Sequence, residues 1–173
     1  MTDEAKRLFF ALDCPPVQRK AIAQWRGELG LRTGKPVLAD NFHLTLLFLG
    51  DVPLAQINEV CEAAGNVQKP GEPLRIALDR LQVWHRAGVL SLAPEQAPQA
   101  LLRLVYALEQ AMLPFGLEET AREFRPHLTL ARDYRAPEPE SATPPEFFLR
   151  AERFALFESH KGRYRILQEW SLI

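Results

Sequence analysis

Two of the four histidines of this chain begin the same tetrapeptide, once as His43-Leu44-Thr45-Leu46 and once as His127-Leu128-Thr129-Leu130. The two copies start 84 residues apart, about half the length of the chain, and so indicate a weak internal duplication. Each copy lies in a short apolar run that predicts a strand, where successive side chains alternate between faces. The histidine and the threonine of each copy therefore share one face, and the leucines anchor the other. Two such strands placed together would surround one small volume with two imidazoles and two hydroxyls.

This set of side chains suits acid-base chemistry on a phosphate ester. A neutral imidazole accepts a proton from an attacking water or hydroxyl, an imidazolium donates one to the departing oxygen, and the threonine hydroxyls donate to the non-bridging oxygens. Both states are accessible because the imidazole pKa is about 6.5, and two neighbouring imidazoles disfavour double protonation. We therefore expect a bell-shaped dependence of rate on pH.

A single His-x-Thr on a strand is more often structural than catalytic, so the functional interpretation depends on the matched pair. The remaining histidines, His85 and His160, lack the motif and are predicted to be surface or structural residues. Neither motif has a further His or Cys at the spacing of a zinc site, and zinc takes three or four protein ligands. The sequence therefore predicts chemistry without a metal or another cofactor.

Apolar periodicity and turn residues predict the elements that position the motifs. Helices are expected over 15–29, from Pro53 to Gly65, and from Pro98 through Met112; a proline-rich surface loop is expected over 136–146. Strands are expected over 8–12, 42–49, 74–78, 88–93, 124–131, 154–157 and 164–167. The last strands follow the loop and are too few to form a domain, so they must join the existing body. We expect one domain over 1–173.

Composition limits the classes of partner. The 173 residues include 21 Lys and Arg against 22 Asp and Glu, so the net charge of -1 gives no field for wrapping duplex nucleic acid. Any contact with a nucleic acid is expected to be local, at a terminal phosphate and a few nucleotides, with a shallow salt dependence. Cys14 and Cys61 form no recognisable framework, and no apolar run reaches the ~18 residues of a membrane span. We expect a cytoplasmic monomer that does not enter a membrane.

Three longer runs, over 7–13, 40–50 and 125–132, resemble the two-histidine (2H) phosphoesterase superfamily, and within it the bacterial RNA 2′,3′-cyclic phosphodiesterases, also called 2′-5′ RNA ligases. The resemblance covers nearly the whole chain. It implies a bilobal α+β fold, in which two pseudo-symmetric lobes of antiparallel sheet backed by helices enclose a central cleft. It also implies that RNA 2′,3′-cyclic phosphate ends, and small cyclic nucleotides, are opened to 2′-phosphomonoesters.

The resemblance further assigns roles to individual residues. His43 would be the proton donor and His127 the proton acceptor, Thr45 and Thr129 would bind the phosphate, and Arg132 would balance its charge. Arg132 lies five residues after His127, which strict alternation places on the opposite face. Its role therefore requires that the strand end or bulge there.

Several alternatives stay open at the level of sequence. The same acid and base would serve ligation, in which a 5′-hydroxyl replaces water and forms a 2′-5′ linkage. A non-catalytic nucleotide or RNA-end binding module is a third hypothesis, which the intact histidines and threonines disfavour. Arg125 suits a surface position, and Tyr164 is a further candidate for substrate contact. Four aromatic residues suit either core packing or stacking on a terminal base, namely Phe9, Phe42, Phe48 and Trp84.

Overall fold

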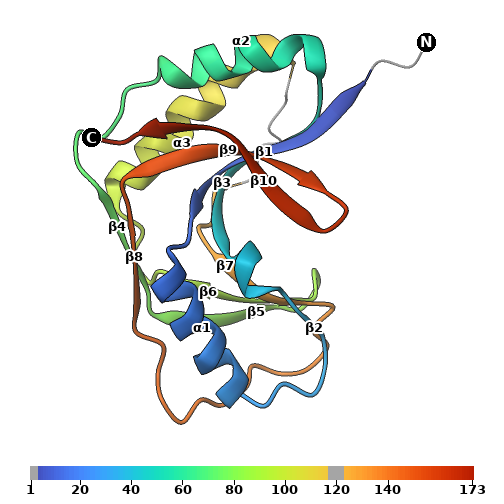
Figure 1. The fold of residues 1–173 in the computed structure, drawn as a ribbon. Helices are drawn as coiled ribbons and strands as arrows, with labels where there is room; N and C mark the ends of the chain where they lie inside the picture. The colour runs from blue at the N-terminus through green and yellow to red at the C-terminus, as the bar shows by residue number, and fades with distance from the viewer. Residues whose placement is uncertain (1–3, 117–122) are drawn as a thin grey trace.

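The computed structural model, which describes residues 4–116 and 123–173, joins antiparallel strands and helices into an α+β fold, as predicted (Figure 1). The strands are β1 (Ala5–Asp13), β2 (Lys35–Pro36), β3 (His43–Pro53), β4 (Leu74–Leu78), β5 (Arg80–Trp84), β6 (Val89–Ala93), β7 (Leu128–Arg132), β8 (Phe147–Ala151), β9 (Arg153–His160) and β10 (Arg163–Ser171). The helices are α1 (Pro16–Glu28), α2 (Leu54–Gly65) and α3 (Gln99–Met112), with the 3-10 turns η1 (Ala39–Asn41) and η2 (Leu113–Phe115).

The main sheet has two halves. Its order is β10-β9-β1-β3-β7-β6-β5, with β2 paired to β7, and β4 pairs with β8 in a separate two-stranded sheet. Helices α2 and α3 lie with the half that contains β1, β9 and β10, whereas α1 lies with the half that contains β5 and β6 (Figure 1). The halves meet where β3 pairs with β7, and this ladder is described by one residue pair, Leu44 with Leu128.

The helices begin where the sequence predicts, because a proline precedes each of them. Pro15, Pro53 and Pro98 are the N-cap residues of α1, α2 and α3. Proline fixes its own φ near -65° and cannot continue a helix in the N-terminal direction, so it marks the first turn. Five apolar residues at helical spacing form the buried face of α3, namely Leu101, Leu104, Val105, Leu108 and Met112.

The buried face of α1 is narrower than that of α3. Ile22 and Trp25 are buried, but Val17 is 79% exposed. The first turn of α1 therefore does not pack against the core, whereas the later turns do. In α2, Val60 and Ala64 are buried, whereas Leu54 at the first position is 41% exposed.

Some strand boundaries differ from the prediction. Strand β3 continues to Pro53 rather than ending before Gly50, because Gly50 lies in a bulge: Leu8 pairs with Gly50 and Phe9 with Phe48, so Leu49 has no partner. Gly50 has a φ of 76°, a conformation that glycine adopts at no steric cost. Strand β7 begins at Leu128 rather than at 124.

Three strands were not predicted. Strand β2 is only two residues long, β5 begins one residue after the strand predicted over 74–78, and β8 begins directly after the loop predicted over 136–146. The alternation in β5, Arg-Leu-Gln-Val-Trp, was the available signal for a strand. No helix in the described part of the chain is long and apolar enough to cross a membrane.

Replacement of Leu44 by alanine should destabilise the protein by about 2–5 kcal/mol, because a fully buried leucine at the junction of the halves leaves a cavity. Urea unfolding measures this cost. Leu38→Ala, at a side chain that is 67% exposed, is the matched control and should change the free energy of unfolding by less than about 0.5 kcal/mol. Equal costs for the two variants would contradict the assigned junction.

Candidate active site

The pairing of β3 with β7 brings the two motifs together. Because the strands are antiparallel, the pair Leu44–Leu128 sets His43 beside Thr129 and Thr45 beside His127. Both leucines are fully buried, whereas both histidines and both threonines are half-buried on the opposite face. The alternation predicted from the sequence is therefore present in both copies, and four of the predicted site residues lie around one junction.

Each histidine is held by the same backbone hydrogen bond. His43 Nδ1 lies 2.7 Å from the carbonyl oxygen of Asn41, and His127 Nδ1 lies 2.8 Å from that of Arg125. A carbonyl only accepts, so Nδ1 carries the hydrogen in both rings, and Nε2 is the nitrogen left for proton transfer. His43 Nε2 lies 2.8 Å from Thr45 Oγ1, whose hydroxyl donates to it when the ring is neutral.

Aromatic rings pack against both imidazoles, and they differ between the halves. The His43 ring centroid lies 5.0 Å from that of Phe9 and 5.1 Å from that of Tyr164, the latter edge-on at 87°. His127 lies 4.4 Å from Trp84 at 66°. These contacts restrict both rings to one orientation. Phe157, 6.3 Å from His43, was predicted only as a strand residue, because its proximity depends on how β9 pairs with β1.

Burial and charge make both imidazoles hard to protonate in the free protein. The pKa of His43 is lowered from 6.5 to about 4, chiefly by burial, while its bond to Asn41 opposes the shift and Arg132 and His127 add to it. Burial also lowers the pKa of His127, with Arg132 acting in the same direction and the bond to Arg125 opposing. Both rings are therefore neutral near pH 7 in the absence of an anion.

Arg132 reaches this face because β7 bulges. Ser91 pairs with Thr129 and Leu90 with Ala131, so Leu130 is an extra residue in the ladder. The extra residue shifts the alternation by one, which turns Arg132 to the face of Thr129. The bulge that the sequence-based role of Arg132 requires is present, and the charge of Arg132 acts on both histidines.

Strand β3 has the same irregularity at the equivalent place. Ala11 pairs with Thr45 and Phe10 with Leu47, so Leu46 is the extra residue, three positions after His43 as Leu130 is after His127. The position equivalent to Arg132 is occupied by Phe48, which is 46% exposed. The two halves therefore repeat the bulge but differ in the side chain that follows it.

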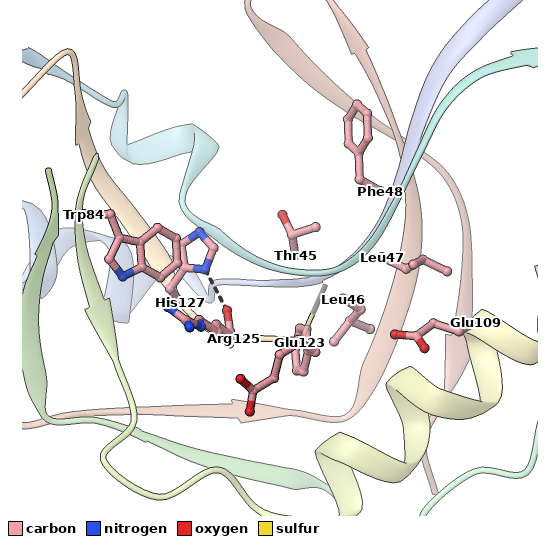
Figure 2. Close-up of a pocket in the computed structure, with 10 residues that line it drawn as sticks. Thr45, Leu46, Leu47, Phe48, Trp84, Glu109, Glu123, Arg125 and His127 are labelled. Carbon is pink, nitrogen blue, oxygen red and sulfur yellow. Dashed lines mark hydrogen bonds between the residues drawn. The ribbon is translucent and has the colours of Figure 1, made fainter. Parts of the chain in front are cut away.

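A pocket of about 530 Å³ lies beside Thr45 and His127 (Figure 2). Figure 2 shows Trp84 against His127 at one end of it and Glu109 toward the other. Its size is that of sites for small organic ligands, which span roughly 300–1,000 Å³. The residues that line it are Thr45, Leu46, Leu47, Phe48, Trp84, Glu109, Glu123, Phe124, Arg125 and His127.

The candidate aromatic residues divide between this pocket and the core. Phe48 and Trp84 line the pocket, whereas Phe42 is 1% exposed and packs under the guanidinium of Arg26. Sequence analysis did not select Glu109, Glu123 or Phe124, because nothing in their local pattern indicates that they border the histidine face. Within residues 4–116 and 123–173, no group of three or more His, Cys, Asp or Glu is arranged to hold a metal ion.

Comparison with known proteins assigns the family. The class of protein is a phosphoesterase: a family described as LigT like Phosphoesterase matches the chain twice, over residues 12–91 and 92–167. The RNA 2′,3′-cyclic phosphodiesterase of Escherichia coli (strain K12) is 36% identical over 179 residues, covering 98% of both chains. That of Thermus thermophilus is 31% identical over 182 residues, covering 96% of this chain and 90% of the relative.

Solved structures of LigT-family phosphoesterases have the same fold as this chain. A crystal structure of E. coli LigT complexed with 3'-AMP has a TM-score of 0.85 at 34% identity, and the match covers 97% of this chain and 98% of that one. This chain belongs to the LigT-like phosphoesterase family. The two family matches contain one tetrapeptide each, in agreement with the predicted internal duplication.

The titration of both histidines should depend on Arg132. Arg132→Ala should raise both imidazole pKa values, because it removes a cation that opposes protonation. NMR titration of the imidazole Cε1–H resonances measures this, with the His43 midpoint of the unmodified protein expected near 4. Arg125→Ala is the matched control, since it removes another exposed guanidinium but keeps the carbonyl that holds His127. Unmoved midpoints in Arg132→Ala would contradict the placement of its charge.

Proposed function

We propose that this protein hydrolyses RNA 2′,3′-cyclic phosphate ends to 2′-phosphomonoesters by metal-independent acid-base catalysis between His43 and His127. The main support is geometric: two imidazoles, each held through Nδ1 by a carbonyl two residues earlier, occupy equivalent positions at one strand junction. The relatives named RNA 2',3'-cyclic phosphodiesterase supply the substrate class.

The reaction needs one proton accepted and one donated. In the proposed assignment, His127 Nε2 accepts a proton from the attacking water as the new phosphorus–oxygen bond forms. His43 Nε2 donates a proton to the 3′ oxygen as its bond to phosphorus breaks, so the phosphate stays on the 2′ oxygen. Thr45 and Thr129 hydroxyls donate to the non-bridging oxygens, and Arg132 balances their charge.

Because the imidazole pKa values are low in the free protein, protonation of His43 depends on whether the anionic substrate is bound. A donor histidine must carry its proton when the leaving oxygen departs, yet burial disfavours imidazolium at His43 in the free protein. A bound cyclic phosphate carries a negative charge, which stabilises imidazolium beside it and raises its pKa. Substrate binding would therefore favour the protonated form of His43, which donates its proton to the departing 3′ oxygen.

Both halves supply a histidine and a threonine, so neither half is a complete site. We infer that the described halves act as one catalytic unit and that a single copy of the chain suffices, because it provides both members of the pair. The pocket beside His127 would accommodate the terminal nucleoside, with Trp84 and Phe48 offering aromatic faces.

His43→Ala and His127→Ala should each lower turnover of a 2′,3′-cyclic nucleotide by about 10²-fold or more, because each removes one proton-transfer group. Chromatography that resolves 2′- from 3′-phosphate products, in excess chelator, measures both the rate and the regiochemistry. His85→Ala, at an exposed histidine outside the motifs, is the control and should retain full activity. A 3′-phosphate product, or activity that the chelator abolishes, would sink the proposed mechanism.

The pH dependence of kcat/KM should be bell-shaped, with both limbs below pH 6.5. The active form holds one proton on the pair, and both imidazole pKa values are lowered in the free protein, so this form is most populated on the acidic side. The kcat profile reports the substrate complex and should lie at higher pH, because the bound anion raises the same pKa values. A flat kcat/KM between pH 5 and 9 would exclude catalysis by this pair.

A further inference from the structure

The side chain of Asn41 attaches the segment before the first motif to the tip of the β9–β10 hairpin. Its Nδ2 donates a hydrogen bond to the carbonyl oxygen of Gly162, at 3.1 Å. Asn41 is the last residue of η1, which leads into β3, and Gly162 lies in the turn between β9 and β10. The bond therefore joins two segments that are 121 positions apart in the chain.

The backbone of the same residue orients His43. The carbonyl oxygen of Asn41 accepts the Nδ1–H of His43, at 2.7 Å, and Nε2 then faces the hydroxyl of Thr45, at 2.8 Å. A neutral imidazole carries one hydrogen, and the hydrogen bond that each nitrogen makes decides which of them holds it. If the carbonyl lay out of reach, the Nε2–H form would donate to Thr45 instead. The position of the Asn41 carbonyl therefore determines which nitrogen of His43 takes part in proton transfer.

The turn that accepts the Asn41 bond has a restricted backbone. Lys161 and Gly162 have φ values of 51° and 76°, and the residues on either side of them, His160 and Arg163, pair with each other. Positive φ at both central residues of a two-residue hairpin loop is typical of a type I′ turn, whose twist matches that of the flanking strands. The short turn thus gives the Gly162 carbonyl a defined position.

The same hairpin contacts the ring of His43. Tyr164 of β10 lies edge-on to the imidazole, with the ring centroids 5.1 Å apart, and Phe157 of β9 lies 6.3 Å from it. Both rings belong to the strands that carry the turn. The hairpin therefore acts on His43 in two ways, by ring contacts with the imidazole and by the bond to Asn41.

The half that contains His127 has no equivalent attachment. The carbonyl oxygen of Arg125 lies 2.8 Å from His127 Nδ1, but the Arg125 side chain makes no hydrogen bond or ion pair with the part of the chain that the structure describes. Of the two motif histidines, His43 is the one whose supporting carbonyl belongs to a residue with a side chain bonded to another element.

We propose that Asn41 is a positioning residue for His43: its side-chain bond to the carbonyl of Gly162 fixes the backbone carbonyl that keeps the imidazole hydrogen on Nδ1. The effect on turnover rests on the proposed function, in which His43 is the proton donor, whereas the effect on the tautomer does not. The β9–β10 hairpin then acts on proton transfer through Asn41.

NMR of the His43 imidazole at pH 7 tests the structural step. Burial lowers the pKa of His43 to about 4, so the ring is neutral at this pH, and long-range ¹H–¹⁵N correlations report which nitrogen carries the hydrogen. The unmodified protein should show the Nδ1–H form. Asn41→Ala, which keeps the carbonyl but lacks the amide, should add the Nε2–H form. Asn58→Ala removes an exposed amide from α2 and should leave the tautomer unchanged.

Turnover of a 2′,3′-cyclic nucleotide tests the catalytic step. Asn41→Ala should lower kcat by about tenfold or more and leave KM within about twofold, because a misdirected imidazole impairs proton transfer more than binding. Asn41→Gln retains a side-chain amide donor and should keep a larger share of kcat than Asn41→Ala. Asn58→Ala should match the unmodified protein.

A substitution in the turn tests whether the hairpin is the partner. A β-branched residue disfavours a φ of 76°, and a side chain at Gly162 would meet open space, so Gly162→Val acts on the turn alone. Gly162→Val should also lower kcat. Asn41→Ala/Gly162→Val should lose no more than the larger of the two single losses, because both substitutions break one bond. Losses that multiply in the double variant would overturn the link.

Two other results would overturn the proposal: a His43 ring that keeps Nδ1–H fully in Asn41→Ala, or a shifted tautomer with an unchanged kcat. If the unmodified protein opens no cyclic phosphate, the proposed function is wrong. The NMR comparison of Asn41→Ala with Asn58→Ala then still decides whether the Asn41 side chain holds the ring in its tautomer.

Discussion

The candidate site depends on the antiparallel pairing of β3 with β7 at Leu44 and Leu128. This pair is the point at which the two halves of the sheet are joined, and it sets each histidine beside the threonine of the other motif. The buried leucines pack in the core, whereas the half-buried histidines and threonines beside them form the candidate site. A slip of one residue in this register would move every motif side chain to the wrong face, so the packing of the core also determines the geometry of the site.

The motifs, the face that each motif shares, and most of the helices and strands could be predicted from the sequence. These features follow from local periodicity and from the prolines before the helices. The bulges at Leu46 and Leu130 could not be located from the sequence, since a bulge is defined by the partner strand and each site lies among consecutive apolar residues. The orientation of Arg132 depends on one of these bulges. The approach of Phe157 to His43 and the pocket residues Glu109 and Phe124 likewise depend on tertiary packing.

At the candidate site, burial of the two imidazoles opposes the protonated form that the proposed proton transfer requires. Aromatic packing orients both imidazoles but removes them from water, and Arg132 adds a positive charge, so each ring resists protonation. An anionic ligand relieves that resistance. The burial and the charge of Arg132, which keep both imidazoles neutral in the free protein, would therefore favour negatively charged ligands over neutral molecules of the same shape.

The bulged strands are equivalent, but Arg132 and Phe48 at their matching positions are not. A cleft with true twofold symmetry would accept a ligand in two opposite orientations with equal affinity, and either histidine could then face a given oxygen of the ligand. One charged and one aromatic end remove this degeneracy. The difference between Arg132 and Phe48, together with the different aromatic neighbours of the two histidines, thus makes the two ends of the cleft distinct for a bound ligand.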